Sequence, residues 1–298
     1  MAFVGLDVGT TGCKAVVFYD NGRPASEATK EIAIGQPAPG WAEQDPQEVW
    51  DAVLFVLRTC VSRYSGNEPI AALGLSVQGE AVIPLGPDGA ALRPAILGMD
   101  TRSREECEQL RRDWGADRLF KETGMPVHTV NTLSKLMWLR RHEQAVWRKA
   151  SQFVLYEDYL ALRLTGATAI SRCLASRTQL YSLHKHDWWP EMLEYVGLSP
   201  DRLSRVVPSA TPVGRLLPEV SAQTGLPSDV LVATGGHDQA CAALGAGVTA
   251  PGRAMVSTGT AEVMEIALDR PLLDPRLARA AISCYEHVIP GLYLLMTL

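Results

Sequence analysis

The alternation of apolar and polar positions near the N-terminus predicts an antiparallel meander of three strands. Residues 2–8 and 13–19 are apolar and rich in strand-forming residues. Asp20-Asn21-Gly22 is a hairpin turn signal, and residues 24–34 follow it as a third strand. The first turn of this meander is therefore residues 9–12, between the first two strands.

Beyond the meander, helical and strand patterns alternate along the chain. Asp45 and Pro46 form a helix start, and apolar residues follow at helical spacing. Residues 70–77 are a short apolar run, which predicts a buried strand parallel to the first. Residues 102–164 are mostly helical in pattern, and residues 229–233 form a further strand that leads through glycines into a small-residue helix. This alternation predicts an α/β fold.

A second hairpin with a Gly/Thr tip occurs late in the chain. Residues 253–267 have the pattern of strand, turn and strand, with residues 257–260 at the tip. Residues 3–18 have the same pattern, with residues 9–12 at the tip. The two hairpins suggest a duplicated fold whose halves face one ligand.

Composition excludes several classes of protein. The 298 residues are 47% hydrophobic and 20% charged, which is ordinary for a globular chain of one large domain or two. The net charge of −5 argues against a broad nucleic-acid-binding surface. The 6 cysteines are scattered without a C-x-x-C pair, so no disulfide framework or zinc site is expected, and a reducing cytoplasm is favoured. No apolar run approaches the ~18 residues of a membrane span, and the start of the chain lacks the basic segment of a signal peptide.

Several short motifs follow one another in a definite order. They are Asp7-Val8-Gly9-Thr10-Thr11, Gly40-Trp41-Ala42-Glu43-Gln44-Asp45-Pro46, Gly74-Leu75-Ser76-Val77-Gln78, Gly235-Gly236-His237-Asp238-Gln239 and Ser257-Thr258-Gly259-Thr260. In order and separation the set resembles the FGGY family of carbohydrate kinases. The resemblance covers the whole chain, and the ensemble is specific although no single motif is.

The resemblance implies an actin/Hsp70-like ATPase fold, related to ribonuclease H, in which helices flank a mixed sheet. It divides the chain into an N-terminal sugar-binding domain over residues 1–247 and the beginning of a C-terminal nucleotide-binding domain over residues 248–298. The glycine-rich segment that holds adenosine in this family lies further on, and residues 292–298 have the pattern of an interrupted strand. The chain is therefore expected to be truncated in its second domain, and of low activity by itself.

The resemblance also implies an activity: ATP-dependent phosphorylation of a hydroxyl group on a small-molecule sugar or polyol, with Mg²⁺. A pentulose such as xylulose is favoured, and glycerol or another polyol is the alternative. The implied protein acts in the cytoplasm without nucleic acid or membrane, and a homodimer is possible from the general prevalence of twofold symmetry.

Two aspartates are candidates for the chemistry of phosphoryl transfer. Asp238 follows a strand and two glycines at a helix start, where a carboxylate can accept the proton of the attacking hydroxyl. By resemblance it matches the family's catalytic base, and the alternative is a helix N-cap. Asp7 ends the first strand, where aspartate is an unfavourable strand residue. It is a candidate Mg²⁺ ligand, and the alternative is a turn cap.

The two Gly/Thr turns are the candidate phosphate sites. Hydroxyl and backbone N–H groups would hold the phosphates, and a lysine would add a positive charge. The residues are Gly9, Thr10, Thr11, Gly12 and Lys14 on the first hairpin and Thr258, Gly259 and Thr260 on the second. An ordinary solvated strand lysine is the alternative for Lys14.

Four polar residues are candidates for sugar recognition: Gln78, Glu80, Asp100 and Gln239. Amides and carboxylates suit vicinal hydroxyls, and the alternative for Gln78 and Glu80 is an edge-strand bulge with exposed polar groups. After this glutamine, xylulose kinases typically carry Met-His and glycerol kinases Arg-Glu, whereas this chain has Gly79-Glu80 and matches neither fully. The alternative for Asp100 is an N-cap of a helix that begins at residue 102. The arginines of this helix, Arg102 included, are expected to be solvated.

Two other classes of function share part of this sequence pattern. A sugar-binding or ATPase-related domain without turnover would share these motifs, and the expected truncation makes it an alternative for the chain alone. A dinucleotide-dependent dehydrogenase is disfavoured because no G-x-G-x-x-G follows the first strand.

Overall fold

A mixed sheet of six strands forms the centre of the larger part of the molecule. The computed structural model describes residues 1–258 and 262–297. The strand order is β13-β14-β5-β1-β2-β3, with β14, β5 and β1 parallel and the other pairs antiparallel. These strands are β1 (Ala2–Val8), β2 (Gly12–Tyr19), β3 (Pro24–Glu31), β5 (Ile70–Val77), β13 (Pro212–Arg215) and β14 (Leu231–His237).

The predicted meander and the predicted parallel pair are both confirmed. The strands β1, β2 and β3 follow one another antiparallel, and β5 pairs with β1 in parallel. The strand expected over 229–233 is displaced, because β14 runs from Leu231 through both glycines to His237. It does so because the glycines allow the backbone to stay paired with β5 where a side chain would not fit.

Three helices cover one face of this sheet: α1 (Pro46–Ser62), α6 (Tyr156–Thr165) and α9 (Pro218–Thr224). Their apolar side chains share one core with alternate residues of β1, such as Val4 and Leu6. The helix α1 begins as predicted: the Asp45 carboxylate accepts the Gln47 backbone N–H at 2.8 Å, and Pro46 is the first helical residue. The opposite face of β1 is open to solvent at Phe3 and Asp7.

A helical layer lies beside the sheet and has its own core. Apolar side chains of α2, α3, α4, α5 and α8 pack together there. Four short strand pairs, β4–β7, β6–β8, β9–β12 and β10–β11, join this layer to the rest. The bounds are α2 (Arg104–Trp114), α3 (Ala116–Thr123), α4 (Thr132–His142), α5 (Gln144–Lys149), α7 (Arg172–Ala175), α8 (Pro190–Val196), β4 (Glu43–Gln44), β6 (Ile83–Leu85), β7 (Ala95–Ile96), β8 (Gln152–Val154), β9 (Ile170–Ser171), β10 (Tyr181–Ser182), β11 (Asp187–Trp188), β12 (Val206–Val207) and a 3-10 helix, Pro200–Arg202.

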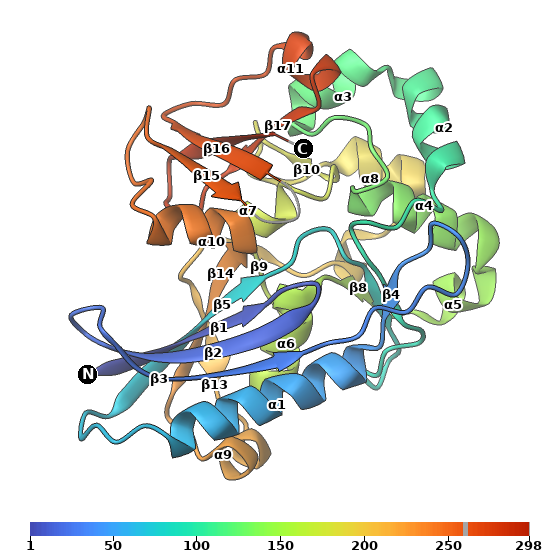
Figure 1. Ribbon diagram of the computed structural model, residues 1–298. Coiled ribbons are helices and arrows are strands. Elements are labelled where there is room, and N and C mark those ends of the chain that lie inside the picture. The colour runs from blue at the N-terminus through green and yellow to red at the C-terminus, as the bar shows by residue number, and fades with distance from the viewer. Residues whose placement is uncertain (259–261, 298) are drawn as a thin grey trace.

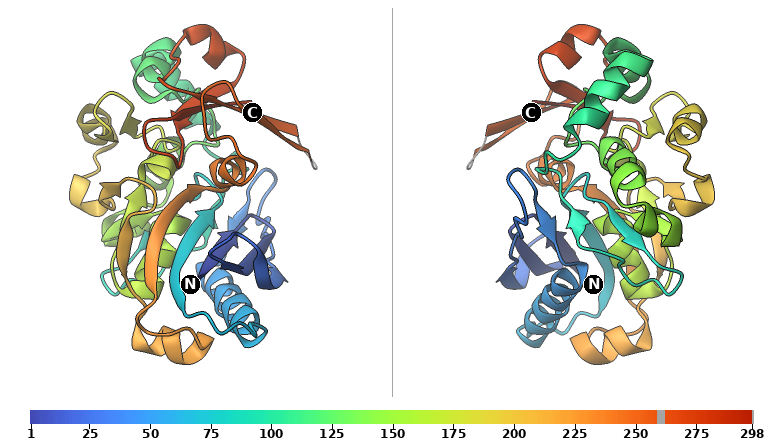
Figure 2. Two further views of the ribbon diagram at one scale, coloured as in Figure 1. Left: turned by 90° about the vertical axis from the view of Figure 1, so that its left-hand side faces the viewer. Right: turned by 90° about the vertical axis from the view of Figure 1, so that its right-hand side faces the viewer.

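The C-terminal segment forms a second sheet, in the order β15-β16-β18-β17. Figure 1 shows it above the central sheet, with α10 between the two, and both side views in Figure 2 show α11 beside α3. The Cys284 N–H donates to the Gly124 carbonyl at 2.8 Å, which joins β17 to the helical layer. The bounds are β15 (Ala254–Thr258), β16 (Glu262–Leu268), β17 (Ile282–Glu286), β18 (Tyr293–Thr297), α10 (Asp238–Gly245) and α11 (Pro275–Arg279).

The second hairpin expected from sequence is present as the antiparallel pair β15–β16, in which Thr258 lies opposite Glu262. Of its predicted phosphate-binding residues, Gly259 and Thr260 lie outside the described residues. No helix among residues 1–258 and 262–297 is long and apolar enough to cross a membrane.

Candidate active site

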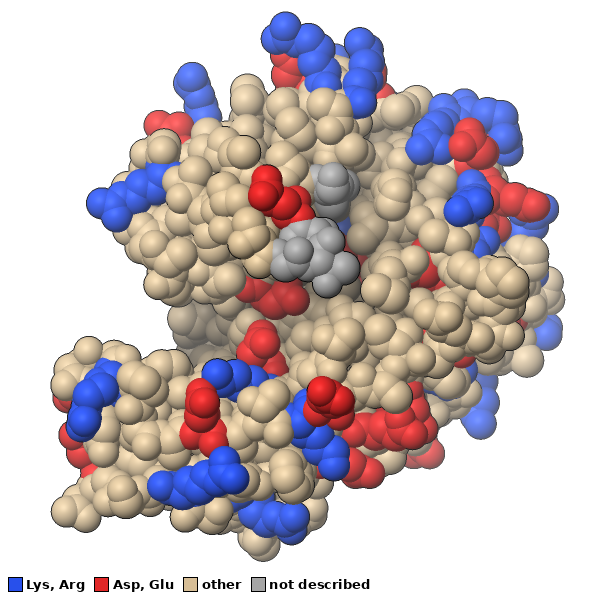
Figure 3. Space-filling view, viewed as in Figure 1, with Lys and Arg blue, Asp and Glu red and all other residues tan. Residues whose placement is uncertain are grey.

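The carboxyl ends of the parallel strands β1, β5 and β14 meet at one edge of the central sheet. In the sheet register Asp7 lies opposite Ser76, and Ser76 lies opposite Gly236. Asp7, Gln78 and Asp238 are thereby brought together, as the sequence predicted. Ligands of open α/β sheets bind outside such carboxyl ends. Figure 3 shows this face hollowed between the part that carries β1–β3 and the part that carries β15, β16 and α10.

Asp7 lies on the solvent-exposed face of β1, next to the last residue of the strand. Its Oδ1 accepts a hydrogen bond from the Ser76 hydroxyl at 2.6 Å, and the residue as a whole is exposed. Lys14 is the register partner of Asp7 on β2, but its ammonium lies 2.8 Å from the Glu27 carboxylate on β3, and both side chains are exposed. A phosphate contact of Lys14 therefore stays a prediction.

The turn between β1 and β2 is held from behind by two amide side chains. Gln44 Nε2 donates to the Thr10 carbonyl at 2.5 Å, and Gln78 Nε2 donates to the Gly9 carbonyl at 3.3 Å and to Gln44 Oε1 at 2.9 Å. The turn itself closes with the Gly9 N–H on the Gly12 carbonyl at 2.9 Å. The turn carbonyls of Gly9, Thr10 and Gly12 are thus engaged, and Thr11 is exposed, so a phosphate contact of this turn stays a prediction. Gln78 thus supports the turn, and its contact with a sugar stays a prediction.

A bulge in β14 places Asp238 at the end of that strand. The register with β5 shifts between Ala233 and Gly236. Within the bulge the Gly235 N–H donates to Glu157 Oε1 at 2.8 Å, and a Cβ atom at 235 would lie 1.7 Å from the Leu75 carbonyl oxygen. Only glycine fits there, and the buried Glu157 satisfies the N–H that the bulge frees.

Asp238 is the first residue of α10, as predicted, and its Oδ1 accepts the Gln239 N–H at 2.7 Å. Burial, together with the nearby charge of Asp7, raises the pKa of Asp238 to about 7. A carboxylate with a pKa near neutrality suits general base catalysis. The adjacent Gln239 Oε1 is buried and lacks a hydrogen-bond partner among the described residues, which leaves it to accept a ligand hydroxyl.

Glu80 is buried, and so is Gln78, so the interpretation as an exposed edge-strand bulge is wrong. The Glu80 backbone has a φ of 58°, a left-handed conformation stabilised where its carbonyl accepts the Thr132 hydroxyl at 3.1 Å. Its Oε1 receives both Nε at 2.6 Å and a terminal nitrogen at 2.5 Å from Arg177. Arg177, also buried, thus neutralises the carboxylate.

Asp100 is not a helix cap, because α2 begins at Arg104 with Ser103 in the cap position. Both of its carboxylate oxygens are occupied: Oδ2 accepts the Ala42 N–H at 2.6 Å, and Oδ1 accepts the Arg102 N–H at 2.9 Å. The expectation that Arg102 is solvated is also wrong. Its buried guanidinium pairs with Asp100 at 2.8 Å and lies 3.7 Å from the centre of the Trp41 ring, so these residues tie two loops together.

Four buried residues beside the site were missed by sequence reasoning: Arg177, His237, Glu265 and Tyr285. His237 lies within a predicted motif, and a lone histidine in a glycine-rich strand end was the one signal that could have drawn attention to it. The other three come together only through the fold, since Arg177 and its partner Ser283 are 106 positions apart.

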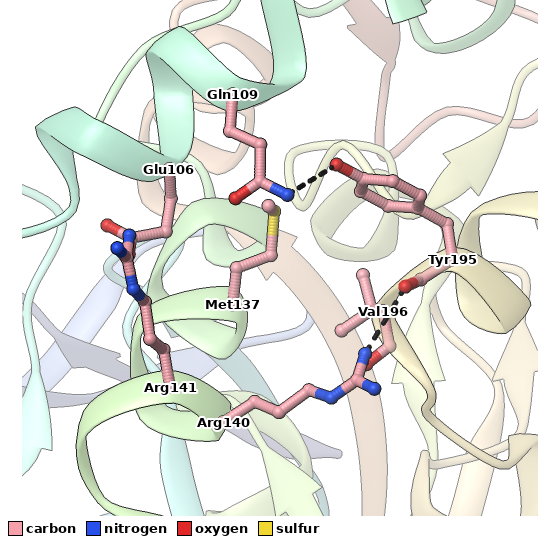
Figure 4. A pocket seen from close by; sticks show the side chains of 7 residues that line it. All are labelled: Glu106, Gln109, Met137, Arg140, Arg141, Tyr195 and Val196. Atoms are coloured by element: carbon pink, nitrogen blue, oxygen red, sulfur yellow. Dashed lines mark hydrogen bonds and ion pairs between the residues drawn. The ribbon is translucent and has the colours of Figure 1, made fainter. Parts of the chain in front are cut away.

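A pocket of about 270 Å³ lies elsewhere, among α2, α4 and α8 (Figure 4). In it Gln109 Nε2 donates to the Tyr195 hydroxyl at 3.1 Å, and Arg140 donates to the Val196 carbonyl at 2.5 Å. None of the sequence-predicted site residues lines it, so the sheet edge and not this pocket is the candidate active site.

Among residues 1–258 and 262–297, no cluster of three or more His, Cys, Asp or Glu side chains could hold a metal ion by itself. A single carboxylate such as Asp7 is compatible with Mg²⁺, which keeps several waters and takes one or two protein carboxylates beside substrate phosphates, and its role as a ligand stays a prediction. The exposed carboxylate at the hollowed edge suits such a role.

Comparisons with known proteins agree with this geometry. Residues 2–245 match the N-terminal domain of the FGGY family of carbohydrate kinases. The chain is 32% identical over 295 residues to the xylulose kinase of Escherichia coli (strain K12), covering 99% of this chain and 60% of that protein. It is 27% identical over 282 residues to the gluconokinase of Bacillus subtilis (strain 168), covering 95% of this chain and 54% of that protein. The crystal structure of xylulose kinase from Rhodospirillum rubrum superposes with a TM-score of 0.93 at 28% identity, over 99% of this chain and 60% of that one.

The mixed sheet, its covering helices and the acidic strand ends define an α/β protein with the actin/Hsp70-like ATPase fold, as predicted. The chain belongs to the FGGY family of carbohydrate kinases. It spans about 60% of the length of the xylulose kinases that it matches.

Proposed function

We propose that the protein phosphorylates a sugar or polyol hydroxyl with ATP, and that Asp238 is the general base. The observation that carries this proposal is the position of Asp238, at the carboxyl edge of the sheet with a pKa raised to about 7 by burial. A base with that pKa is half ionised near neutral pH, so it can take the proton as the hydroxyl attacks.

Positioning and charge neutralisation do most of the work in phosphoryl transfer. In the proposed arrangement the turn Gly9–Gly12, with Lys14, holds phosphate oxygens from one side, and Thr258, Gly259 and Thr260 hold them from the other. Asp7 would hold Mg²⁺, which when bound neutralises charge on the phosphates. His237 and Glu80 are buried beside the base, whereas the Asp238 side chain is 30% exposed, so a ligand can reach it.

For the acceptor we propose a pentulose, with xylulose favoured because relatives with that name match almost the whole chain. Gln239 and Glu80 would form hydrogen bonds with its hydroxyls. Gln78 and Asp100 would line the edge of the same site. The alternative acceptor is glycerol or another polyol, and the specific observation for it is Glu80, the glutamate that also occurs in glycerol kinases. Gly79 departs from the motifs of both xylulose kinases and glycerol kinases. The acceptor must therefore be identified by assaying a panel of sugars and polyols.

Three further parts of the proposal concern the whole protein. We divide the chain at residue 247, where the family match and the first sheet have both ended and the second sheet is about to begin. We place the protein in the cytoplasm, since its 6 cysteines are all free. Its partners are a small-molecule acceptor and ATP, and a homodimer is proposed on symmetry grounds alone.

The test is an ADP-release assay across pentuloses, hexonates and polyols, using the protein that carries this sequence. We expect one acceptor to be strongly preferred, and Asp238→Asn to lower kcat by at least about a hundredfold while the thermal unfolding temperature changes little. Wild-type turnover in Asp238→Asn would exclude Asp238 as the base. No turnover with any acceptor in the wild type would exclude the kinase assignment.

A further inference from the structure

A chain of buried polar side chains runs from Asp238 into the second sheet. Asp238 Oδ1 lies 3.2 Å from His237 Nε2, and the other ring nitrogen, Nδ1, lies 3.4 Å from the Tyr285 hydroxyl. The Tyr285 hydroxyl in turn donates to Glu265 Oε1. The four groups therefore form one continuous path from the sheet edge to β16, and beyond Asp238 its members have no chemical role in the function proposed above.

The path is closed to solvent behind Asp238. His237 is 5% exposed, and Tyr285 and Glu265 are 0% exposed. Glu265 Oε2 is buried and has no hydrogen-bond partner among the described residues. An unpaired buried carboxylate oxygen is costly when charged and much less so when the group is protonated, so Glu265 is suited to take up a proton. Burial accordingly raises the pKa of Glu265.

The titratable groups that surround this path come from every neighbouring element. They are Asp7 on β1, Glu80 after β5, Cys173 on α7, Arg177 after α7 and Cys241 on α10. Arg177 is the cation among them, with its guanidinium 4.7 Å from the centre of the Tyr285 ring. Burial, and then the charge of Arg177, lowers the pKa of His237 well below its usual range, so its imidazole is neutral.

The hydrogen bonds fix where the protons are. Tyr285 has a single hydroxyl proton, and it is donated to Glu265, so the oxygen that faces His237 can only accept. Nδ1 must then carry the imidazole proton, and Nε2 is an acceptor that faces Asp238. This arrangement suits Asp238 when it is protonated, because its O–H can donate to Nε2.

We propose that His237, Tyr285 and Glu265 form a proton relay that empties Asp238 after it has taken the proton of the substrate hydroxyl. The Asp238 proton passes to His237 Nε2, the Nδ1 proton passes to the Tyr285 oxygen, and the Tyr285 proton passes to Glu265 Oε1. One proton thereby moves from Asp238 to Glu265, the imidazole changes tautomer and stays neutral, and no electrons are transferred. The source of the proton rests on the proposed function, whereas the relay itself does not.

Gly79 keeps the relay in register. A Cβ atom at position 79 would lie 2.7 Å from His237 Cδ2 and 2.9 Å from Nε2, so only glycine leaves the ring in line with Asp238. The relay residues come from both proposed domains, since Tyr285 is on β17 and Glu265 on β16.

The relay is tested without substrate by ¹⁵N NMR of histidine-labelled protein, which reports the tautomer of each ring. The signals of His237 are assigned by their loss in His237→Gln. In the wild type we expect the Nδ1–H tautomer when Asp238 is protonated. Once rising pH has removed one proton and Asp238 is ionised, we expect the Nε2–H tautomer, because the new carboxylate requires a donor and the Tyr285 hydroxyl can then turn its proton from Glu265 to Nδ1. A His237 ring that keeps one tautomer throughout would overturn the relay.

Variants sharpen the test. In Tyr285→Phe, Nδ1–H loses its acceptor, so the ring should stay in the Nε2–H form at every pH. Tyr181→Phe is the matched control, because Tyr181 is equally buried and donates to a different carboxylate, Glu286. It should retain the switch of the wild type. A pH-dependent switch that survives in Tyr285→Phe would contradict the relay.

Kinetics provide the second readout. With the preferred acceptor, Tyr285→Phe should lower kcat by about tenfold or more, with the KM values for acceptor and ATP changed by less than about twofold. An unchanged kcat would overturn the relay. If the wild type phosphorylates no acceptor, the proposed function fails, and the NMR measurement still decides the relay.

Discussion

The imidazole of His237 occupies the space that a side chain at position 79 would need. This relationship gives a physical reason for a glycine at position 79: Cδ2 and Nε2 of the ring lie 2.7 and 2.9 Å from the position of a Cβ at residue 79. The departure at 79 and the histidine before Asp238 are thus one feature of the molecule. A side chain at 79 and the present position of the His237 ring cannot both be accommodated, so the ring or the backbone would have to shift.

Gly79→Ala is therefore expected to displace the ring and to lower the free energy of unfolding by about 1–3 kcal/mol, as overpacking does in a filled interior. Urea unfolding measures it. The control is Gly74→Ala on β5, where a Cβ meets no atom within 4 Å. Equal effects of the two substitutions would show that the ring moves aside freely.

The buried pair Glu80–Arg177 gives a second prediction. Arg177→Met leaves the Glu80 carboxylate buried without its partner, and we expect a loss of about 3–5 kcal/mol in the free energy of unfolding. Glu80→Gln combined with Arg177→Met should recover part of that loss, because the unpaired charge is gone. Urea unfolding of the wild type, both single variants and the double variant measures the coupling.

An exposed pair calibrates this experiment. Lys185 and Glu191 lie 3.4 Å apart with both side chains about half exposed, so Glu191→Gln should cost less than about 1 kcal/mol. If Arg177→Met costs no more than Glu191→Gln, or if the double variant is as unstable as the sum of the single ones, the assignment of a coupled buried charge is incorrect.

The buried carboxyl of Asp158 should make the protein less stable as pH rises. Burial raises the pKa of Asp158 to about 7, above the ~3.9 of an unfolded aspartate. The native state thus binds this proton more tightly than the unfolded state, and its contribution to stability is full below about pH 4 and is lost as pH rises through about 7. In Asp158→Asn the free energy of unfolding should fall less over this range. A pH dependence equal to that of the wild type would contradict the prediction.

Glu157 should tolerate an amide less well than Asp158 does. Both Glu157 oxygens accept backbone N–H groups, from Ser171 at 2.7 Å and Gly235 at 2.8 Å. In glutamine the side-chain NH₂ would replace one of these acceptors and would face a backbone N–H donor. Asp158 accepts one N–H from Leu155 at 2.7 Å and one hydroxyl at 2.6 Å, and a hydroxyl can accept as well as donate. We expect Glu157→Gln to cost about 1–3 kcal/mol more than Asp158→Asn, in urea unfolding near neutral pH. Equal costs would show that the bulge at Gly235 does not depend on this carboxylate.

The Mg²⁺ dependence of activity tests Asp7. In Asp7→Asn the Mg²⁺ concentration for half-maximal turnover should rise by about tenfold or more, because magnesium strongly prefers carboxylate oxygens to amide oxygens. Ser76→Ala removes the hydroxyl that donates to Asp7 and keeps the carboxylate, so its requirement should change far less. An unchanged requirement in Asp7→Asn would remove Asp7 from the metal site.

Local sequence patterns predicted most elements of the fold and the positions of Asp7 and Asp238 at strand and helix ends. They could do so because strand alternation, turns and caps depend on residues a few positions apart. They failed where the energetics depend on distant partners. Arg102 has the sequence context of a solvated helix start, yet it is buried because Trp41, 61 positions before it, supplies a ring on which it stacks. Similarly, Glu80 is neutralised by an arginine 97 positions away, and no periodicity reports such a pair.

The buried contacts between the two sheets also bear on how proteins of this kind can be recombined. Arg177 donates to Ser283 at 3.0 Å, and His237 faces Tyr285, so buried polar groups of one part have their hydrogen-bond partners in the other. A hybrid that joins the first part of this chain to the second part of a relative would inherit one half of each contact. Residues 177, 237, 265, 283 and 285 would therefore have to be exchanged together, because their contacts cross the boundary between the two parts.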